Sequence, residues 1–450
     1  MNPGKKPDKL LIVRNLAIGW LLVLGAFSWG ALTITQEWWP YTAIKSLQAF
    51  VSGDKEEKIS LTDKIKNDFG IKPSRHIVES QRQYAVPEHY QALEGLDLNP
   101  RRVPPLMHLA GNAPPAYRVI YGTFDFNDGL HGAVLLGPDG TLVNTWVMSQ
   151  EDAAWADRDD QNVFPHGFEI FPDGSVVVAF DGGSSLTRYS YCGKELWRVK
   201  GLFHHSVSAS DDGAVWTWGN PNGELKNGEF MVKVMVESGE IVESIHLDEV
   251  WPENPDIDPF ATRQDDQPTG SIWSFDRWHV NDVEPLPERF AEAYEAFEAG
   301  DLLLSLRSIN LVVVVDPATY AVKWWRQGLT RRQHDPDWNE RGSITIFDNN
   351  MHRDFSRIYD VWPDTFESSI AVPGEDYGFY TWHRGKHDVI PGGGYMITST
   401  EQGRAFEINA AGEIVFDFVN QFQKGGKFLA LSEARHLPID FFKELPECER

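Results

Sequence analysis

Cysteine, positive charge and the common catalytic signatures are scarce in this chain. Its 450 residues contain two cysteines, Cys192 and Cys448, too few for a disulfide framework or a zinc cluster, although the sequence allows one bridge between them. No G-x-S-x-G elbow, P-loop, H-E-x-x-H or C-x-x-C motif occurs, so the usual signals of hydrolases, nucleotide-binding folds, zinc peptidases and redox proteins are absent. The 41 Lys and Arg residues oppose 66 Asp and Glu residues, a formal net charge of −25. Because so acidic a body repels phosphate backbones, we expect no nucleic-acid partner.

Long apolar runs are also missing, with one exception near the N-terminus. Leu16 to Ile34 (LAIGWLLVLGAFSWGALTI) carries no charge and is long enough to cross a bilayer as a helix. Basic residues before it hold the N-terminus in the cytoplasm: Lys5, Lys6, Lys9 and Arg14. A cleaved signal peptide is the alternative, but the run exceeds the roughly 7–15-residue apolar region of such peptides. We therefore expect a single-pass anchor in the cell inner membrane, with the rest of the chain in the periplasm.

A repeated pattern begins near Tyr117. A strand, a turn and a second strand recur in six copies, AVLLGPDGTLVNTW, LTRYSYCGKELWRV, MVKVMVESGEIVESI, LVVVVDPATYAVKWW, SRIYDVWPDTFESSI and AFEINAAGEIVFDF. Short strands separated by Gly or Asp turns and repeated in this way are typical of an all-β, six-bladed propeller. The first copy lacks an upstream inner strand, so we predict that 428–438 (FLALSEARHLP) supplies it. The ring would then be closed by pairing of N- and C-terminal strands, which removes exposed sheet edges.

The predicted organisation follows from the anchor and the repeat. It comprises a cytoplasmic basic tail (1–14), a transmembrane anchor (15–35), a juxtamembrane linker region (36–115), a β-propeller domain (116–440) and a C-terminal tail (441–450). Two segments, 248–278 and 287–301, are insertions in the repeat. The second contains an amphipathic helix, with Phe290 and Tyr294 on the face that we expect to pack on the body.

A histidine opens the first strand in five of the repeat units. These residues are His166, His205, His279, His334 and His387. Because the first strand of each blade lines the channel of a propeller, we expect the five imidazoles to converge at one mouth. Such a ring could bind metal, relay protons, or act as nucleophile and base. The short-range ligand pairs typical of metal sites are missing, so we expect no metal and no cofactor.

The residues around two of these histidines favour binding of an anion. His279 and Asn281 lie two apart on one strand and share a face, and Arg307 on the returning strand offers a planar fork to sulfate, phosphate or carboxylate. The alternative is an ion pair between Arg307 and an acidic neighbour such as Asp282. His334 is a competent nucleophile when neutral, with Asp335 or a backbone carbonyl to fix its tautomer. The alternative is a structural histidine.

Several motifs in 160–440 resemble the arylsulfotransferase family, bacterial enzymes that move sulfate between phenols without an activated nucleotide donor. The motifs are HHSVSASDDGAVW, WHVNDVEPL followed by LLSLRS, QHDPDWNERGSITIFDN and STEQGRAFEINAAGEIVFDF followed by ARHLP. The resemblance implies a six-bladed propeller and a ping-pong reaction from an aryl sulfate donor to a phenolic acceptor.

The resemblance also implies roles for individual residues. His334 matches the nucleophile that becomes transiently sulfated. His279, Asn281 and Arg307 match the groups that hold the sulfate oxygens. His205 matches a base or sulfate contact, and Thr400 is a weaker match beside them. From their places in the predicted ring, His166 and His387 are added as substrate-binding candidates.

Two other functions fit the same fold. A non-catalytic propeller could use its rim to bind another envelope or membrane protein, which the anchor and the insertions favour. A propeller hydrolase or lyase acting on envelope glycans is the third interpretation. The joint presence of His279, Asn281, Arg307 and His334 favours the sulfotransferase, because a scaffold needs none of them. A homodimer and a membrane-protein partner both remain compatible with the sequence.

Overall fold

The chain divides into two compact units, Met1–Pro73 and Ser74–Arg450. The computed structural model describes residues 18–29, 77–78, 84–148, 163–181, 183–221, 229–257, 278–423 and 427–448. In the first unit, residues 18–29 form a helix. Among the described residues no helix is both long and apolar enough to cross a bilayer. The basic tail 1–14 and the ends of the predicted anchor 15–35 lie outside the described residues.

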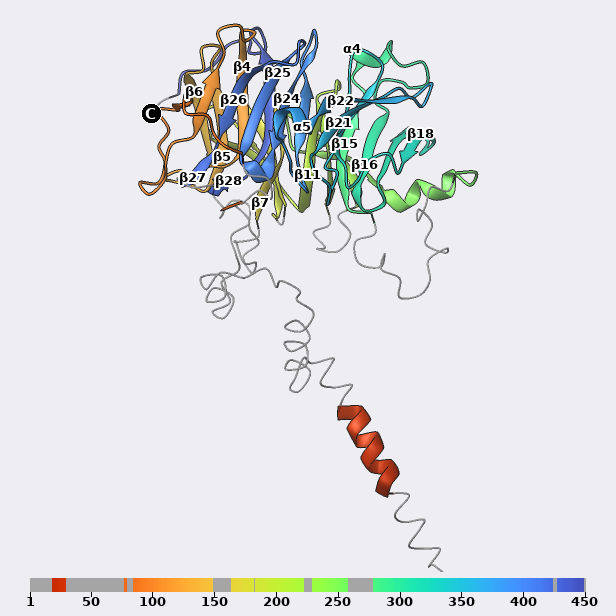
Figure 1. Cartoon of the computed structure of the whole chain (residues 1–450). Helices are drawn as coiled ribbons and strands as arrows, with labels where there is room; N and C mark the ends of the chain where they lie inside the picture. Colours follow the sequence, from red (N-terminus) through yellow and green to blue (C-terminus); the bar gives the residue numbers. More distant parts are fainter. Residues whose placement is uncertain are drawn as a thin grey trace, which may run out of the picture. The chain divides into compact units, whose positions relative to one another are not determined.

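The second unit is a β-propeller of six blades, so the predicted all-β architecture is confirmed (Figure 1). Blade 1 contains β29 (Leu431–Pro438), β4 (Ala116–Thr123), β5 (His131–Leu136) and β6 (Leu142–Met148), and blade 2 contains β7 (Phe164–Ile170), β8 (Val176–Asp181), β9 (Ser185–Tyr189) and β10 (Glu195–Lys200). Blade 3 contains β11 (Leu202–Ala209), β12 (Ala214–Asn220), β13 (Phe230–Met235) and β14 (Ile241–His246). Blade 4 contains β15 (Val280–Pro285), β16 (Leu302–Leu306), β17 (Leu311–Val315) and β18 (Val322–Gln327).

Blades 5 and 6 complete the propeller. Blade 5 contains β19 (His334–Trp338), β20 (Ile344–Asp348), β21 (Arg357–Val361) and β22 (Ser368–Pro373). Blade 6 contains β23 (Lys386–Val389), β24 (Gly394–Ser399), β25 (Arg404–Asn409), β26 (Ile414–Val419), β3 (Leu106–Leu109) and β2 (Gln91–Ala92). A small further sheet joins β1 (Ile77–Val78), β28 (Lys427–Leu429) and β27 (Gln421–Gln423). The short helices are α4 (Glu288–Ala291), α5 (Gly374–Tyr377) and the 3-10 helices η3 (Leu247–Glu249), η4 (Trp251–Glu253), η6 (Arg307–Ile309) and η7 (Thr400–Gln402).

The inner strands surround a channel. Each contacts the inner strands on either side, in the circular order β29, β7, β11, β15, β19, β23 and back to β29. Strands in the middle of a blade, such as β17 with its sequence LVVVV, are buried along their whole length, because both faces of a blade pack on neighbouring blades. The cores therefore lie between blades, as where Trp218 of blade 3 clusters with Leu304 of blade 4.

Two blades combine strands from distant parts of the chain. In blade 1, β29 pairs with β4, and in blade 6, β26 pairs with β3. Figure 1 shows the corresponding orange and blue strands side by side. Strands β2 and β3 fall inside the predicted linker region 36–115, so part of that region extends blade 6.

The second insertion and the C-terminal residues pack on the propeller. Helix α4 has four residues, shorter than the helix predicted for 287–301. Tyr294 and Phe297 nevertheless pack on Trp338 of blade 5, with ring centroids 5.0 and 5.4 Å away. Cys192, in the turn after β9, forms a disulfide with Cys448. The described end of the chain is thereby joined to blade 2.

Candidate active site

The inner strands are distorted where several predicted site residues lie. A shift in pairing register near the start of the strand marks a β-bulge in five of the six: at His166 in β7, at His205 and Ser206 in β11, at Asn281 in β15, at Asp335 in β19 and at Ser432 in β29. A bulge re-aims its side chain and interrupts regular pairing. His205 and Asp335 have φ angles of 68° and 51°, a backbone conformation that is strained for residues with a side chain and is concentrated at functional sites.

At the end of the channel where the inner strands begin, imidazoles lie side by side. The ring centroids of His166 and His205 are 4.4 Å apart, and those of His205 and His279 are 5.4 Å apart. Burial lowers the pKa of His166 and of His205 well below the usual 6.5. The charge of Arg384 lowers the pKa of His166 further, and the neighbouring histidines, His166 first, lower that of His205. Both rings are therefore neutral at pH 7. We call His166, His205, His279 and His334 the histidine cluster.

His334 is held in a defined tautomer. Its Nδ1 lies 2.6 Å from Asn349 Oδ1, and the Asn349 amide nitrogen donates to the carbonyl oxygens of Thr381 and Arg384. The amide oxygen must therefore face His334, and because that oxygen only accepts, Nδ1 holds the proton. The lone pair remains on Nε2, to which the Arg384 backbone N–H donates at 3.2 Å.

Of the two groups predicted to fix the tautomer of His334, the backbone carbonyl is present and Asp335 is not. The Arg332 carbonyl oxygen lies 3.2 Å from His334 Nδ1. Adjacent strand residues point in different directions, and Asp335 instead accepts from Lys386 Nζ at 2.7 Å and contacts His387. Burial, followed by repulsion from Arg307, lowers the pKa of His334 well below 6.5. A neutral imidazole that keeps its lone pair on Nε2 is the nucleophilic form. Attack through Nε2 requires that the hydrogen bond from the Arg384 backbone N–H be given up.

The charge of Arg307 and the imidazole of His279 both act on the pKa of His334, and Asn281 contacts the residue before it, Gln333. Arg307 opens η6 directly after β16, and its backbone N–H donates to the His279 carbonyl oxygen at 3.2 Å. Asp282, the alternative partner of Arg307, faces Lys386 with 4.0 Å between Oδ2 and Nζ. Asn281 donates one amide hydrogen to the Gln333 carbonyl oxygen at 2.8 Å, which leaves its second amide hydrogen for another acceptor.

Arg384 lies beside the cluster, where its backbone N–H contacts His334. Thr400 is fully buried in η7, and its hydroxyl has no hydrogen-bond partner among the described residues. Arg384 was not predicted. Its guanidinium lies 3.6 Å from the centre of the Phe164 ring, and its charge contributes to the lowered pKa of His166. The basic motif HRGKHD at 383–388, which runs into the inner strand β23, is the sequence signal that could have identified it.

Lys386 separates the two ends of the channel. Its Nζ lies 2.7 Å from Asp335 Oδ1 and 4.0 Å from both Asp282 Oδ2 and Glu433 Oε2. These carboxylates belong to three other blades, so the ammonium group lies near the channel axis. Burial alone would lower the pKa of Lys386, but the carboxylates of Asp282, Asp335 and Glu433 raise it well above its usual value. Lys386 is therefore a permanent cation between the histidine cluster and the other mouth.

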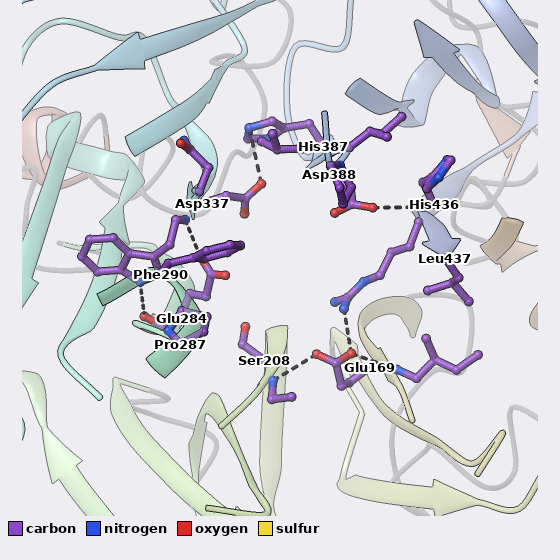
Figure 2. A pocket seen from close by; sticks show the side chains of 18 of the residues that line it. Glu169, Ser208, Glu284, Pro287, Phe290, Asp337, His387, Asp388, His436 and Leu437 are labelled. Atoms are coloured by element: carbon purple, nitrogen blue, oxygen red, sulfur yellow. Dashed lines mark hydrogen bonds and ion pairs between the residues drawn. The ribbon is translucent and has the colours of Figure 1, made fainter. Parts of the chain in front are cut away.

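The opposite end of the channel is an acidic cavity of about 660 Å³ (Figure 2). Its lining includes Glu169, Glu284, Asp337, Asp388 and Glu433. His387 also lines this cavity, whereas the histidine cluster does not. The structure thus brings four of the five predicted histidines together and places His387 apart, where its ring contacts Asp335 and Asp337 of blade 5.

Comparison with known proteins identifies one family. A model of the family described as Arylsulfotransferase (ASST) matches residues 167–421, a range that contains His205, His279, Asn281, Arg307 and His334. No curated protein matches the chain. Solved structures with low similarity include a protein of unknown function from Bacteroides caccae, with 11% identity over 72% of this chain and 99% of that chain and a TM-score of 0.46. TolB from Acinetobacter baumannii shares 10% identity over 72% of this chain and 67% of that chain, with a TM-score of 0.44.

Proposed function

The chain belongs to the arylsulfotransferase family, and we propose that it transfers a sulfuryl group from an aryl sulfate ester to a phenolic acceptor through a sulfated His334. The observation that carries this proposal is the tautomer of His334. The Nδ1–H of His334 donates to Asn349 Oδ1, with 2.6 Å between the nitrogen and the oxygen. The nucleophilic lone pair is therefore on Nε2. Arg307 lowers the pKa of the same ring and supplies the positive charge that a sulfate group needs.

In the first half-reaction, Nε2 of His334 attacks the sulfur of the donor. The N–S bond forms, the bond between sulfur and the aryl oxygen breaks, and the phenolate leaves and takes a proton from solvent. Arg307, His279 and Asn281 hold the sulfuryl oxygens, with Thr400 and His166 beside them. The sulfated imidazole is cationic and keeps its Nδ1 proton, which Asn349 Oδ1 accepts, so the charge that develops is stabilised.

In the second half-reaction, the oxygen of an acceptor phenol attacks the same sulfur. His205 accepts the phenol proton and releases it to solvent, the new S–O bond forms, and the N–S bond breaks to restore neutral His334. The partner of the imidazole, Asn349, is neutral. Because a carboxylate would stabilise the positive charge of the sulfated ring, the ring is a better leaving group with the neutral partner. His387 has no part in this scheme because it lies in the cavity.

We also propose that residues 15–35 anchor the chain in the inner membrane with the propeller in the periplasm. The uncharged run from Leu16 to Ile34 and its basic flank support the anchor. The Cys192–Cys448 disulfide supports an oxidising compartment for the propeller.

Mass spectrometry of the full-length chain incubated with 4-nitrophenyl sulfate tests the proposed reaction. Without an acceptor, we expect a sulfo adduct on the peptide that contains His334, together with release of nitrophenol. His334→Ala removes both. His89→Ala, which changes an exposed histidine outside the channel, leaves both unchanged. Wild-type protein that forms no adduct and releases no nitrophenol from several aryl sulfates would favour the non-catalytic scaffold.

A further inference from the structure

One ring nitrogen of His387, in the acidic cavity, is buried without a hydrogen-bond partner among the described residues. Its side chain is fully buried, and its Nδ1 lies 3.1 Å from Asp335 Oδ2. Because Asp335 is held ionised by the ammonium group of Lys386 at 2.7 Å, it accepts the Nδ1 proton and leaves the lone pair on Nε2. This Nε2 is buried and makes no hydrogen bond among the described residues.

The Nε2 lone pair faces a second carboxylate. Asp337 Oδ2 lies 3.4 Å from His387 Nε2, so a carboxylate oxygen and an imidazole nitrogen, both able to bind a metal ion, lie close together in the cavity. One ligand atom from each of Asp335, Asp337 and His387 lies within 4.8 Å of the other two. Two ligands bound at about 2.1 Å to a tetrahedral ion are about 3.4 Å apart, which is the separation of Nε2 and Oδ2 here.

The chemistry of these groups selects a class of ion. An imidazole nitrogen together with carboxylates suits Zn²⁺ or Mn²⁺, whereas Ca²⁺ and Mg²⁺ prefer oxygen ligands throughout. A carboxylate that holds the far imidazole proton, as Asp335 does, is the arrangement that orients histidine ligands in metal sites. Asp282 and Glu284 line the same cavity, and its carboxylates outnumber the cationic groups of Lys386, Arg289 and Arg435.

We propose that the acidic cavity binds one divalent transition-metal ion of the Zn²⁺ or Mn²⁺ class through His387 Nε2 and the Asp337 carboxylate, with Asp335 orienting the imidazole. Solvent completes the coordination, because the Asp337 side chain is 19% exposed. The ion joins β19 of blade 5 to β23 of blade 6. It lies on the side of Lys386 away from the histidine cluster, so this site is independent of the sulfuryl transfer proposed above.

Calorimetry on the untagged full-length chain tests this site after treatment with EDTA. Titration with ZnCl₂ is expected to show one saturable site per chain, and an excess of Zn²⁺ to raise the melting temperature. Asp337→Asn weakens Zn²⁺ binding at least tenfold. Glu340→Gln, which removes an exposed carboxylate of the same cavity, leaves the affinity unchanged.

Three results would overturn the proposal. The first is the absence of saturable Zn²⁺ and Mn²⁺ binding by the wild-type chain. The second is an equal loss of affinity in Asp337→Asn and Glu340→Gln, which would indicate diffuse attraction to an acidic surface. The third is unchanged affinity in both Asp337→Asn and His387→Gln, which would place the ion elsewhere. His387→Gln provides the second ligand variant if Asp337→Asn does not fold, and circular dichroism of each metal-free variant establishes folding.

Discussion

At the residue scale, the contrast between His334 and its neighbour Asp335 explains the separation of the channel into two chemical environments. The His334 side chain lies among the other imidazoles of the cluster and near the charge of Arg307. The Asp335 side chain contacts Lys386 in the acidic cavity. The bulge at Asp335 and its φ of 51° produce this divergence. Two adjacent residues of one strand thus supply the proposed nucleophile to one end of the channel and a carboxylate to the other.

The lowered pKa of His334 predicts a particular pH dependence. Below its pKa the imidazole binds a proton and loses its nucleophilic lone pair, and that pKa lies well below 6.5. We therefore expect kcat/KM for the aryl sulfate donor, which reports the free enzyme, to stay constant from about pH 8 to 6.5 and to fall only at lower pH. Chromatographic measurement of released nitrophenol gives this rate independently of nitrophenol ionisation. An acid limb centred at or above pH 6.5 would contradict the argument.

The sequence is informative about which residues carry chemistry and less so about their partners. His334 and Arg307 are predictable because their motifs are distinctive. Asn349 is not, since nothing in the sequence indicates that its amide is fixed by the carbonyl groups of Thr381 and Arg384. The separate position of His387 depends on the direction of one side chain on β23, which the repeat does not encode.

At the element scale, blade 6 is larger than the repeat predicts. Strand β3 continues the sheet beyond β26, and Tyr84 and Tyr90 donate hydrogen bonds to Asp417 on β26 at 2.7 and 2.8 Å. The segment is Pro-rich and lies outside the repeat, so its pairing could not be predicted from periodicity. Its partners lie more than 300 residues away in the chain.

The ion pair between Arg404 and Asp417 fixes this extension. Both side chains are fully buried, with 2.7 Å between their closest atoms. Asp417→Asn leaves the guanidinium buried without its charged partner, so we expect the free energy of unfolding to fall by about 3 to 5 kcal/mol. Urea unfolding followed by fluorescence measures the change.

An exposed ion pair provides the control for this substitution. Glu195 and Arg198 lie 2.6 Å apart, with side-chain exposures of 44% and 23%. Glu195→Gln should change the free energy of unfolding by less than about 1 kcal/mol, because solvent screens the charges. Equal effects of the two substitutions would show that the buried pair contributes nothing special to blade 6.

At the scale of the whole molecule, six repeated strand pairs are enough to predict a six-bladed propeller, and the fold bears this out. The repeat predicts the fold because blades 2 to 5 are each built from four consecutive strands, and blades 1 and 6 keep three and four consecutive strands. The disulfide is different, since its cysteines are 256 positions apart. Their pairing depends on how the last residues cross blade 2.

Removal of this disulfide should destabilise the whole propeller. The double variant Cys192→Ala, Cys448→Ala frees the chain end, and loss of such a crosslink costs about 2 to 4 kcal/mol. The urea midpoint of the variant should therefore lie below that of the oxidised wild-type chain. A reductant should lower the wild-type midpoint to that of the variant and leave the variant unaffected. Identical midpoints for oxidised wild type and variant would refute a stabilising role.

The split composition of blades 1 and 6 has a consequence for the order of events on the ribosome. Residues 106–123 emerge early, yet the edges of β3 and β4 receive their partners, β26 and β29, only from residues 414–438. Until then the nascent chain exposes two strand edges, which are prone to pair with other chains. The inner wall of the channel is also incomplete until β29 is made. The histidine cluster therefore acquires its enclosed surroundings only after residues 431–438 have been synthesised.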